Sequence, residues 1–217
     1  MKKAVIFDLD GTLTDTLDSI KYCADAAIAV CGYAPYEKDD YKYFVGEGAA
    51  RLIEKCLRNR GDEKLENFDK VFAVYKEVFA ENCMYNVRPY DGIRPLLSRL
   101  KEAGIKIAVL SNKPHAETID VIETLFGKGY FDVIHGQKPD VERKPSPAGV
   151  FCILEQLGLS AQDIAYLGDT CTDMQTGKSA GAFTVGALWG FRDRKELEEN
   201  HADEIIENPL QLLDYVL

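Results

Sequence analysis

The sequence predicts an α/β fold: a doubly wound parallel sheet that carries a small all-helical domain. From residue 89 onward, short apolar runs alternate with amphipathic helical patterns, which is typical of parallel strands with helices on both faces. Between residues 15 and 88 the pattern is helical and contains no convincing strand. We therefore expect a core formed by residues 1–14 and 89–217, with residues 15–88 inserted as a helical cap.

Each element follows from the local pattern. The first strand is the run Ala4–Phe7, which lacks polar alternation and is expected to be buried on both faces. Apolar residues at helical spacing predict insert helices at about residues 16–31, 48–60 and 67–83. The later apolar runs predict strands at Ile105–Leu110, Val133–His135, Ile164–Leu167, Phe183–Ala187 and Glu204–Ile206. The helices expected beside them cover residues 92–103, 115–126, 147–157 and 173–180.

Composition and charge exclude several classes of protein. The formal net charge of −10 argues against general nucleic-acid binding, which needs a basic surface. No apolar stretch approaches the roughly 20 residues that span a bilayer. The apolar run after Met1-Lys2-Lys3 is too short for the core of a signal peptide. We expect a cytoplasmic monomer or homodimer that binds neither nucleic acid nor membrane.

The six cysteines do not form a recognisable metal-binding pattern. They show no Cys-x-x-Cys spacing and do not pair with the three scattered histidines, so structural zinc is not expected. Cys171 lies between two acids, where it is either a small filler residue or a redox-sensitive thiol.

Two aspartates one residue apart follow the first strand. Asp8 and Asp10 leave it at its carboxyl end, where open α/β sheets bind ligands. Two carboxylates so close repel each other unless a cation or a shared proton relieves them. The pair predicts metal-assisted chemistry by a carboxylate nucleophile, and acidic residues of an ordinary turn are the alternative.

Polar groups also follow later strands. Ser111 and Asn112 follow one strand and suit an anion-binding loop, although taken alone they are also typical of an ordinary loop. Lys144 precedes a helix, where it can offset a negative charge or lie on the surface. Asp169 and Asp173 follow another strand and offer oxygen ligands to a hard cation, although Asp173 also suits a helix N-terminus. Together these groups supply the nucleophile, the cation site and the donors that phosphoryl transfer requires.

As an ordered set, these motifs resemble those of the haloacid dehalogenase superfamily of phosphohydrolases. The resemblance covers nearly the whole chain through Asp8–Asp15, Ser111–Lys113, Lys144-Pro145 and Gly168-Asp169 with Asp173. It implies a Rossmann-like core with a small helical cap. Within the cap, Phe44–Gly48 resembles the cap loop of phosphoglycolate phosphatases.

The resemblance also implies roles for individual residues. Asp8 would attack phosphorus and form an aspartyl-phosphate, and Asp10 would protonate the leaving oxygen and then activate water. Mg²⁺ would be held by Asp8, the backbone carbonyl of Asp10 and Asp169, with Asp173 assisting directly or through water. The residues on the phosphate side would be Ser111, Asn112 and Lys144, together with Thr12, which would help to orient the site.

The expected function is Mg²⁺-dependent hydrolysis of a small phosphorylated metabolite, with phosphoglycolate as the leading candidate. Asp10 favours a phosphorus substrate, because dehalogenases of the family lack the second acid. Thr12 favours hydrolysis over sugar phosphomutases, which often carry Val there. A sugar phosphomutase, a pyrophosphatase or a non-catalytic phosphate-binding protein remain alternatives. Close to the cap glycines, three charged residues are expected to be solvated rather than to contact substrate: Lys42, Glu47 and Arg51.

Overall fold

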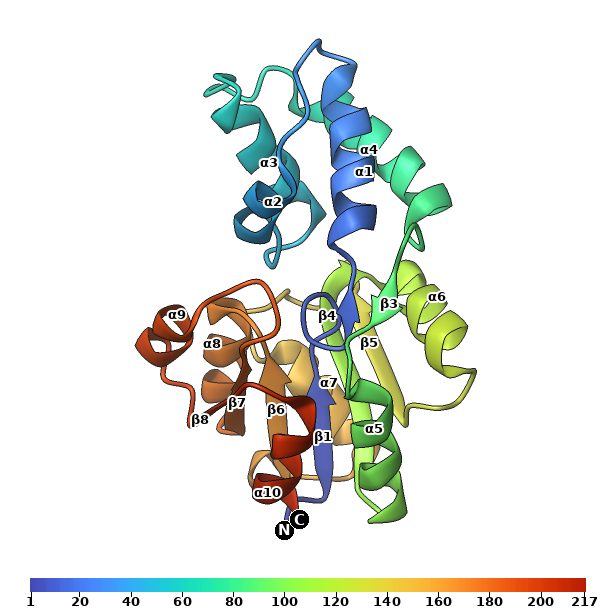
Figure 1. Ribbon diagram of the computed structural model, residues 1–217, viewed down its shortest axis with the longest axis vertical. Coiled ribbons are helices and arrows are strands. Elements are labelled where there is room, and N and C mark those ends of the chain that lie inside the picture. Colours follow the sequence, from blue (N-terminus) through green and yellow to red (C-terminus); the bar gives the residue numbers. More distant parts are fainter. The chain divides into compact units, whose positions relative to one another are not determined.

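The computed structural model describes all 217 residues and divides them into two compact units (Figure 1). The α/β unit contains Met1–Asp15 and Pro89–Leu217, and the helical unit contains Thr16–Arg88. The sequence analysis placed the first boundary one residue earlier and the second at the same position. The first boundary lies directly after β2 (Thr14–Asp15) and the second within β3 (Arg88–Pro89). These two strands form a two-stranded sheet.

The α/β unit is built on a six-stranded sheet with the strand order β5-β4-β1-β6-β7-β8. All neighbouring strands run parallel. The strands are β1 (Ala4–Phe7), β4 (Lys106–Pro114), β5 (Val133–Gln137), β6 (Ile164–Gly168), β7 (Phe183–Ala187) and β8 (Glu204–Ile206). β1 lies inside the sheet between β4 and β6, and its four residues are completely buried. The unbroken apolar run had predicted this burial.

Helices cover both faces of the sheet. On one face, α7 (Ala148–Leu157) packs over Ile6 of β1 and Tyr166 of β6. On the other face lies α5 (Ile93–Glu102), which is in front of the sheet in Figure 1, whereas α7 is behind it. The other helical segments of the unit are α6 (His115–Phe126), η1 (Ala161–Asp163), α8 (Cys171–Ala180), α9 (Arg194–Glu199), η2 (Pro209–Leu212) and α10 (Leu213–Val216). The predicted doubly wound α/β fold is confirmed.

The helical unit consists of four helices. They are α1 (Leu17–Ala29), α2 (Lys38–Phe44), α3 (Ala49–Asn59) and α4 (Phe68–Asn82). α1 packs against each of the other three. The sequence analysis missed α2, a short polar helix whose start is marked by a capping box between Glu37 and Asp40. None of the helices of the protein has the length and apolar character that crossing a membrane requires.

Two element boundaries differ from the sequence prediction in ways that affect polar residues. β4 continues four residues beyond Leu110, through a shift in its pairing with β5, so that Ser111 lies within the end of the strand. α8 begins at Cys171 rather than at residue 173, because Thr170 caps it. Asp173 therefore lies in the first turn of α8. α9 was not predicted, because its short polar sequence has no apolar periodicity.

Candidate active site

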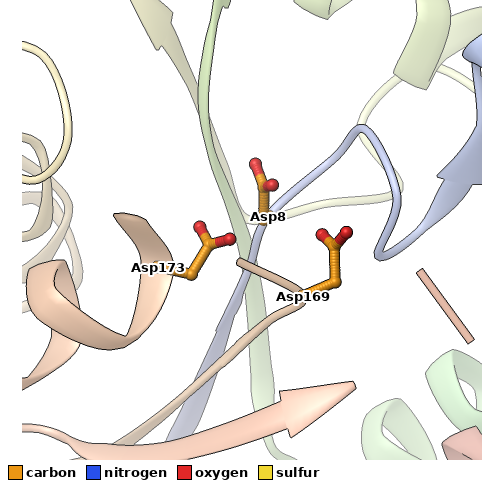
Figure 2. A group of neighbouring side chains, drawn as sticks. All are labelled: Asp8, Asp169 and Asp173. Carbon is orange, nitrogen blue, oxygen red and sulfur yellow. The ribbon is translucent and has the colours of Figure 1, made fainter. Parts of the chain in front are cut away.

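Three carboxylates meet at the carboxyl edge of β1 and β6. Asp8 directly follows β1, Asp169 directly follows β6, and Asp173 extends from the first turn of α8. One oxygen from each of the three lies within 4.8 Å of the others. Figure 2 shows the three side chains directed to the same side. All three are buried, so this is a site where like charges are concentrated away from water.

Lys144 reaches into this acidic cluster (Asp8, Asp169 and Asp173) from the segment before α7. Its ammonium group donates to Asp8 Oδ1 at 2.7 Å and to Asp173 Oδ1 at 2.8 Å. Asn112 holds the backbone of Lys144 from both sides. Asn112 Oδ1 accepts from the Lys144 N–H at 2.9 Å, and Asn112 Nδ2 donates to the Lys144 carbonyl at 3.2 Å. The lysine is thereby fixed to the end of β4.

Burial and the repulsion between neighbouring carboxylates shift the pKa values of the cluster. Burial, followed by the charge of Asp173, raises the pKa of Asp8, while Lys144 opposes this rise. Burial and Asp173 also raise the pKa of Asp169 to about 7. Burial opposes the charge of Lys144, but the carboxylates of Asp173 and Asp8 together outweigh it and raise the pKa of its ammonium group.

The donor set fits a divalent metal ion. Three ionised carboxylates against one ammonium group leave two formal negative charges, which a bound dication would neutralise. Carboxylate oxygens are the ligands that hard cations such as Mg²⁺ and Ca²⁺ prefer. The acidic cluster is therefore a candidate metal site.

Asp169 is held in place by both of its carboxylate oxygens. The Thr12 hydroxyl donates to Oδ1 at 2.8 Å, and the Phe191 backbone N–H donates to Oδ2 at 2.8 Å. The Trp189 indole N–H in turn donates to the Thr12 carbonyl at 2.9 Å. The loop that follows β7 is thus bound both to Asp169 and to the segment after β1, which orients the carboxylate within the cluster.

Two glycines allow the backbone to approach Asp169 this closely. Gly11 has a φ of +92°, and a Cβ atom there would lie 2.3 Å from Asp169 Oδ2. A Cβ atom at Gly190 would lie 2.4 Å from the same oxygen. Any larger residue at either position would displace the carboxylate or the loop.

Asp173 both caps helix α8 and belongs to the acidic cluster. Its Oδ2 accepts from the Thr170 backbone N–H at 3.1 Å and from the Thr170 hydroxyl at 2.8 Å, which caps α8. Its Oδ1 accepts from Lys144 and, at 3.3 Å, from the Tyr166 hydroxyl. The carboxylate of Asp173 therefore does two things: it caps α8, as the sequence suggested, and it belongs to the acidic cluster.

The side chain of Asp10 does not join the three carboxylates. Its Oδ1 instead lies 3.0 Å from Lys113 Nζ. Nearby, the Ser111 hydroxyl oxygen accepts from the Lys113 backbone N–H at 3.2 Å, and its hydrogen can be donated to another group. The site residues proposed from the sequence thus lie within the end of β4, on segments that follow β1 and β6 or, for Lys144, on the segment that Asn112 fixes to β4.

Comparison with known proteins agrees with this geometry. A family model described as haloacid dehalogenase-like hydrolase matches residues 5–187. The chain belongs to the haloacid dehalogenase-like hydrolase family. The predicted family membership is confirmed.

Three similar proteins indicate which members of the haloacid dehalogenase-like family this chain resembles. A phosphoglycolate phosphatase of Aquifex aeolicus is 34% identical over 189 residues, covering 87% of this chain and 86% of that protein. Another, of Neisseria meningitidis serogroup A, is 30% identical over 202 residues, with 92% and 86% covered. A crystal structure from Lactobacillus delbrueckii subsp. bulgaricus, described as a candidate phosphoglycolate phosphatase, has a TM-score of 0.95 at 28% identity and covers 100% of this chain and 99% of that one. The chain is a phosphatase of this family, a phosphoric monoester hydrolase, as predicted.

The sequence analysis of this haloacid dehalogenase-like protein missed several residues of the site. Lys113 is part of the motif Ser111–Lys113, but nothing in the position of this residue along the chain showed that it pairs with Asp10. The loop containing Trp189 and Phe191 follows β7, one strand beyond the last strand end that was considered. Tyr166 lies within the apolar strand β6, where nothing in the sequence pattern marks its hydroxyl as part of the site.

The three charged residues near the glycines of the helical unit are paired with neighbours there. Lys42 lies 2.8 Å from Asp39, Glu47 lies 2.6 Å from Lys55, and Arg51 lies 2.5 Å from Glu54. In the α/β unit, burial and the carboxylate of Glu196 raise the pKa of the Cys171 thiol, which disfavours the reactive thiolate.

Proposed function

We propose that this phosphatase hydrolyses a small phosphate monoester with the help of Mg²⁺, through an aspartyl-phosphate formed on Asp8. The observation that carries the proposal is the buried contact between Asp8 and Lys144, beside the carboxylates of Asp169 and Asp173. A carboxylate nucleophile, a neighbouring ammonium group and a cation site are the parts that phosphoryl transfer needs.

Mg²⁺ is the proposed metal, held by Asp8, Asp169 and the backbone carbonyl of Asp10, with Asp173 assisting directly or through water. The hard oxygen donors and the two uncompensated negative charges of the cluster support this choice. Bound there, the dication supplies positive charge that favours the ionised form of Asp8 and reduces its repulsion of a phosphate.

The protein groups would then act in two steps. A carboxylate oxygen of Asp8 forms a bond to phosphorus while the bond from phosphorus to the leaving oxygen breaks, and Asp10 gives its proton to that oxygen. Asp10 next takes a proton from a water molecule, whose oxygen bonds to phosphorus while the bond to Asp8 breaks.

The remaining site residues are proposed to hold the phosphate or the groups that contact it. Ser111 and Lys144 would donate to phosphate oxygens. Asn112 would share this role while fixing the backbone of Lys144, a contact that its side chain makes. Thr12, placed on the phosphate side from the sequence, is proposed to act mainly by orienting Asp169, because its hydroxyl donates to that carboxylate.

Phosphoglycolate is the leading candidate substrate, because the relatives from Aquifex aeolicus and Neisseria meningitidis bear the name phosphoglycolate phosphatase. We propose that the helical unit, Thr16–Arg88, is the cap domain that selects the substrate, since it is inserted directly after the segment of Asp8 and Asp10. A cytoplasmic location and a monomeric or homodimeric state stay predictions.

A phosphate-release screen tests the proposal. The purified protein is assayed with and without Mg²⁺ on phosphoglycolate, other phosphorylated acids, sugar phosphates, nucleotides and pyrophosphate. We expect Mg²⁺-dependent release that is fastest with phosphoglycolate. Isomerisation of a sugar phosphate without release would indicate a phosphomutase, preference for pyrophosphate a pyrophosphatase, and no turnover a binding protein. A beryllium fluoride soak with Mg²⁺ should produce an adduct on Asp8, and its absence would contradict the nucleophile.

A further inference from the structure

Lys113, which has no role in the steps above, is paired with the proposed acid–base residue, Asp10. Lys113 Nζ lies 3.0 Å from Asp10 Oδ1, and the exposed fraction of the lysine side chain is only 3%. The contact is an ion pair rather than a well-aligned hydrogen bond. A lysine so deeply buried is rarely found without a partner of opposite charge, so the pair is a specific feature of the site.

The backbone of Lys113 is held from both sides. Its N–H donates to the Ser111 hydroxyl oxygen at 3.2 Å, and its carbonyl accepts from the Thr118 hydroxyl at 3.2 Å. At Gly136 on the neighbouring strand, a Cβ atom would lie 2.9 Å from the Lys113 carbonyl oxygen, so the close packing there depends on glycine. The ammonium group of Lys113 therefore extends from a well-defined backbone position.

The two lysines of the site form ion pairs with different members of the aspartate pair, Asp8 and Asp10. Lys144 contacts Asp8 and Asp173, whereas Lys113 contacts Asp10. In Asp10 it is the buried oxygen, Oδ1, that faces the lysine, while the side chain as a whole remains 18% exposed. The second oxygen, Oδ2, is thus left for proton transfer.

We propose that Lys113 is a positioning residue that fixes the carboxylate of Asp10 so that Oδ2 can exchange a proton with the leaving oxygen and then with water. This inference rests on the proposed function, because the acid–base role of Asp10 is part of it. Direct binding of phosphate by Lys113 is the competing explanation.

The leaving group of the substrate distinguishes the two explanations. The alkoxide released from phosphoglycolate needs a proton as its bond to phosphorus breaks, whereas 4-nitrophenolate leaves readily without one. Misplacing Asp10 should therefore slow phosphoenzyme formation from phosphoglycolate much more than from 4-nitrophenyl phosphate. Loss of a phosphate ligand would slow both substrates alike and weaken the binding of inorganic phosphate.

The experiment compares Lys113→Met and Lys113→Gln, which remove the charge, with Lys106→Met, an exposed lysine at the start of the same strand. Single-turnover rates are measured with 4-nitrophenyl phosphate and with phosphoglycolate, or with the alkyl phosphate that the screen ranks first. We expect both Lys113 variants to lose about 10-fold to 100-fold with the alkyl phosphate and less than about 3-fold with the aryl phosphate. Lys106→Met should match the unaltered protein.

Equilibrium and structural measurements complete the test. The dissociation constants of Mg²⁺ and inorganic phosphate should change less than about twofold in the Lys113 variants, since neither ligand is expected to touch the lysine. Equal losses with both leaving groups, weakened phosphate binding or unchanged rates would overturn the proposal.

A crystal structure of Lys113→Gln decides the question independently of activity. We expect the Asp10 carboxylate to adopt more than one orientation while Asp8, Asp169 and Asp173 stay in place, and an Asp10 that keeps its single orientation would overturn the proposal. An unaltered protein that releases no phosphate would contradict the proposed function, whereas the orientation of Asp10 would still decide the role of Lys113.

Discussion

The ammonium group of Lys144 lies 2.7 Å from Asp8 Oδ1, within a buried group of three carboxylates. This contact counters the charge of the proposed nucleophile, but one ammonium group cannot balance three ionised carboxylates. The imbalance has two consequences. The acids destabilise the metal-free protein when they ionise, and a dication should stabilise it.

Asp8→Asn should abolish phosphate release without loss of stability. The amide keeps the shape of the side chain but removes a carboxylate whose pKa is raised by burial and by Asp173, so the metal-free variant should melt at or above the temperature of the unaltered protein. Phosphate-release assays and thermal melting without Mg²⁺ measure both effects.

The matched control for this prediction is Asp203→Asn. Asp203 is paired with Lys178 and accepts from the Thr184 N–H at 2.8 Å, away from the acidic cluster. Its replacement should lower the melting temperature and leave turnover nearly unchanged. Near-normal turnover by Asp8→Asn would refute the assignment of the nucleophile.

Lys144→Met should destabilise the metal-free protein by about 3–5 kcal/mol, because it leaves buried carboxylates without their counter-charge. Urea unfolding with and without Mg²⁺ measures this loss, part of which the dication should restore. The double variant that also carries Asp8→Asn should be less destabilised than Lys144→Met alone. A Lys144→Met protein as stable as the unaltered one without Mg²⁺ would contradict the prediction.

The stabilisation by Mg²⁺ should increase with pH. In the folded protein the pKa of Asp169 is raised to about 7, whereas an aspartate in the unfolded chain has a pKa of about 4. Between about pH 4 and pH 7 the folded metal-free protein therefore binds a proton that the unfolded chain does not bind. The contribution of Asp169 to stability is therefore present below about pH 4 and is lost as the pH rises through about 7.

Metal binding requires the ionised carboxylates, so it competes with these protons. Thermal melting at a series of pH values with and without Mg²⁺ should show a small shift near about pH 5 and a larger shift near about pH 8. The same shift at both pH values would mean that the ion does not bind at the acidic cluster.

Thr12→Val should weaken Mg²⁺ binding about 10-fold to 100-fold, since it removes the hydroxyl that donates to Asp169 Oδ1 at 2.8 Å. Thr176→Val is the matched control, because it removes another buried hydroxyl, which donates to the Thr172 carbonyl within α8. Both variants should lose about 1 kcal/mol of stability. Calorimetric titration with Mg²⁺ should separate them, and equal affinities would contradict an orienting role for Thr12.

The sequence predicted the layout of the sheet well, because burial leaves a direct pattern in it. The apolar run of β1 indicated a strand buried on both faces, and β7, β8 and α6 lie at the positions expected. Parallel strands end at the same edge, so Asp8, Ser111 and Asp169 had to lie near one another once the strands were recognised. The short polar helices α2 and α9 were missed, because they bury too few residues to produce a periodic signal.

The order of residues is enough to show which residue types gather at this edge of the sheet, whereas their pairing follows only from the folded chain. Thr12 and Asp169 are 157 residues apart in the chain, and Lys144 and Asp8 are 136 apart. Whether such side chains meet depends on loop paths, on strand register and on side-chain rotamers, none of which has a local periodicity. For that reason the order of residues predicted four acids and one lysine, Lys144, in the site, but only the folded chain paired Lys144 with Asp8 and brought Lys113 to Asp10.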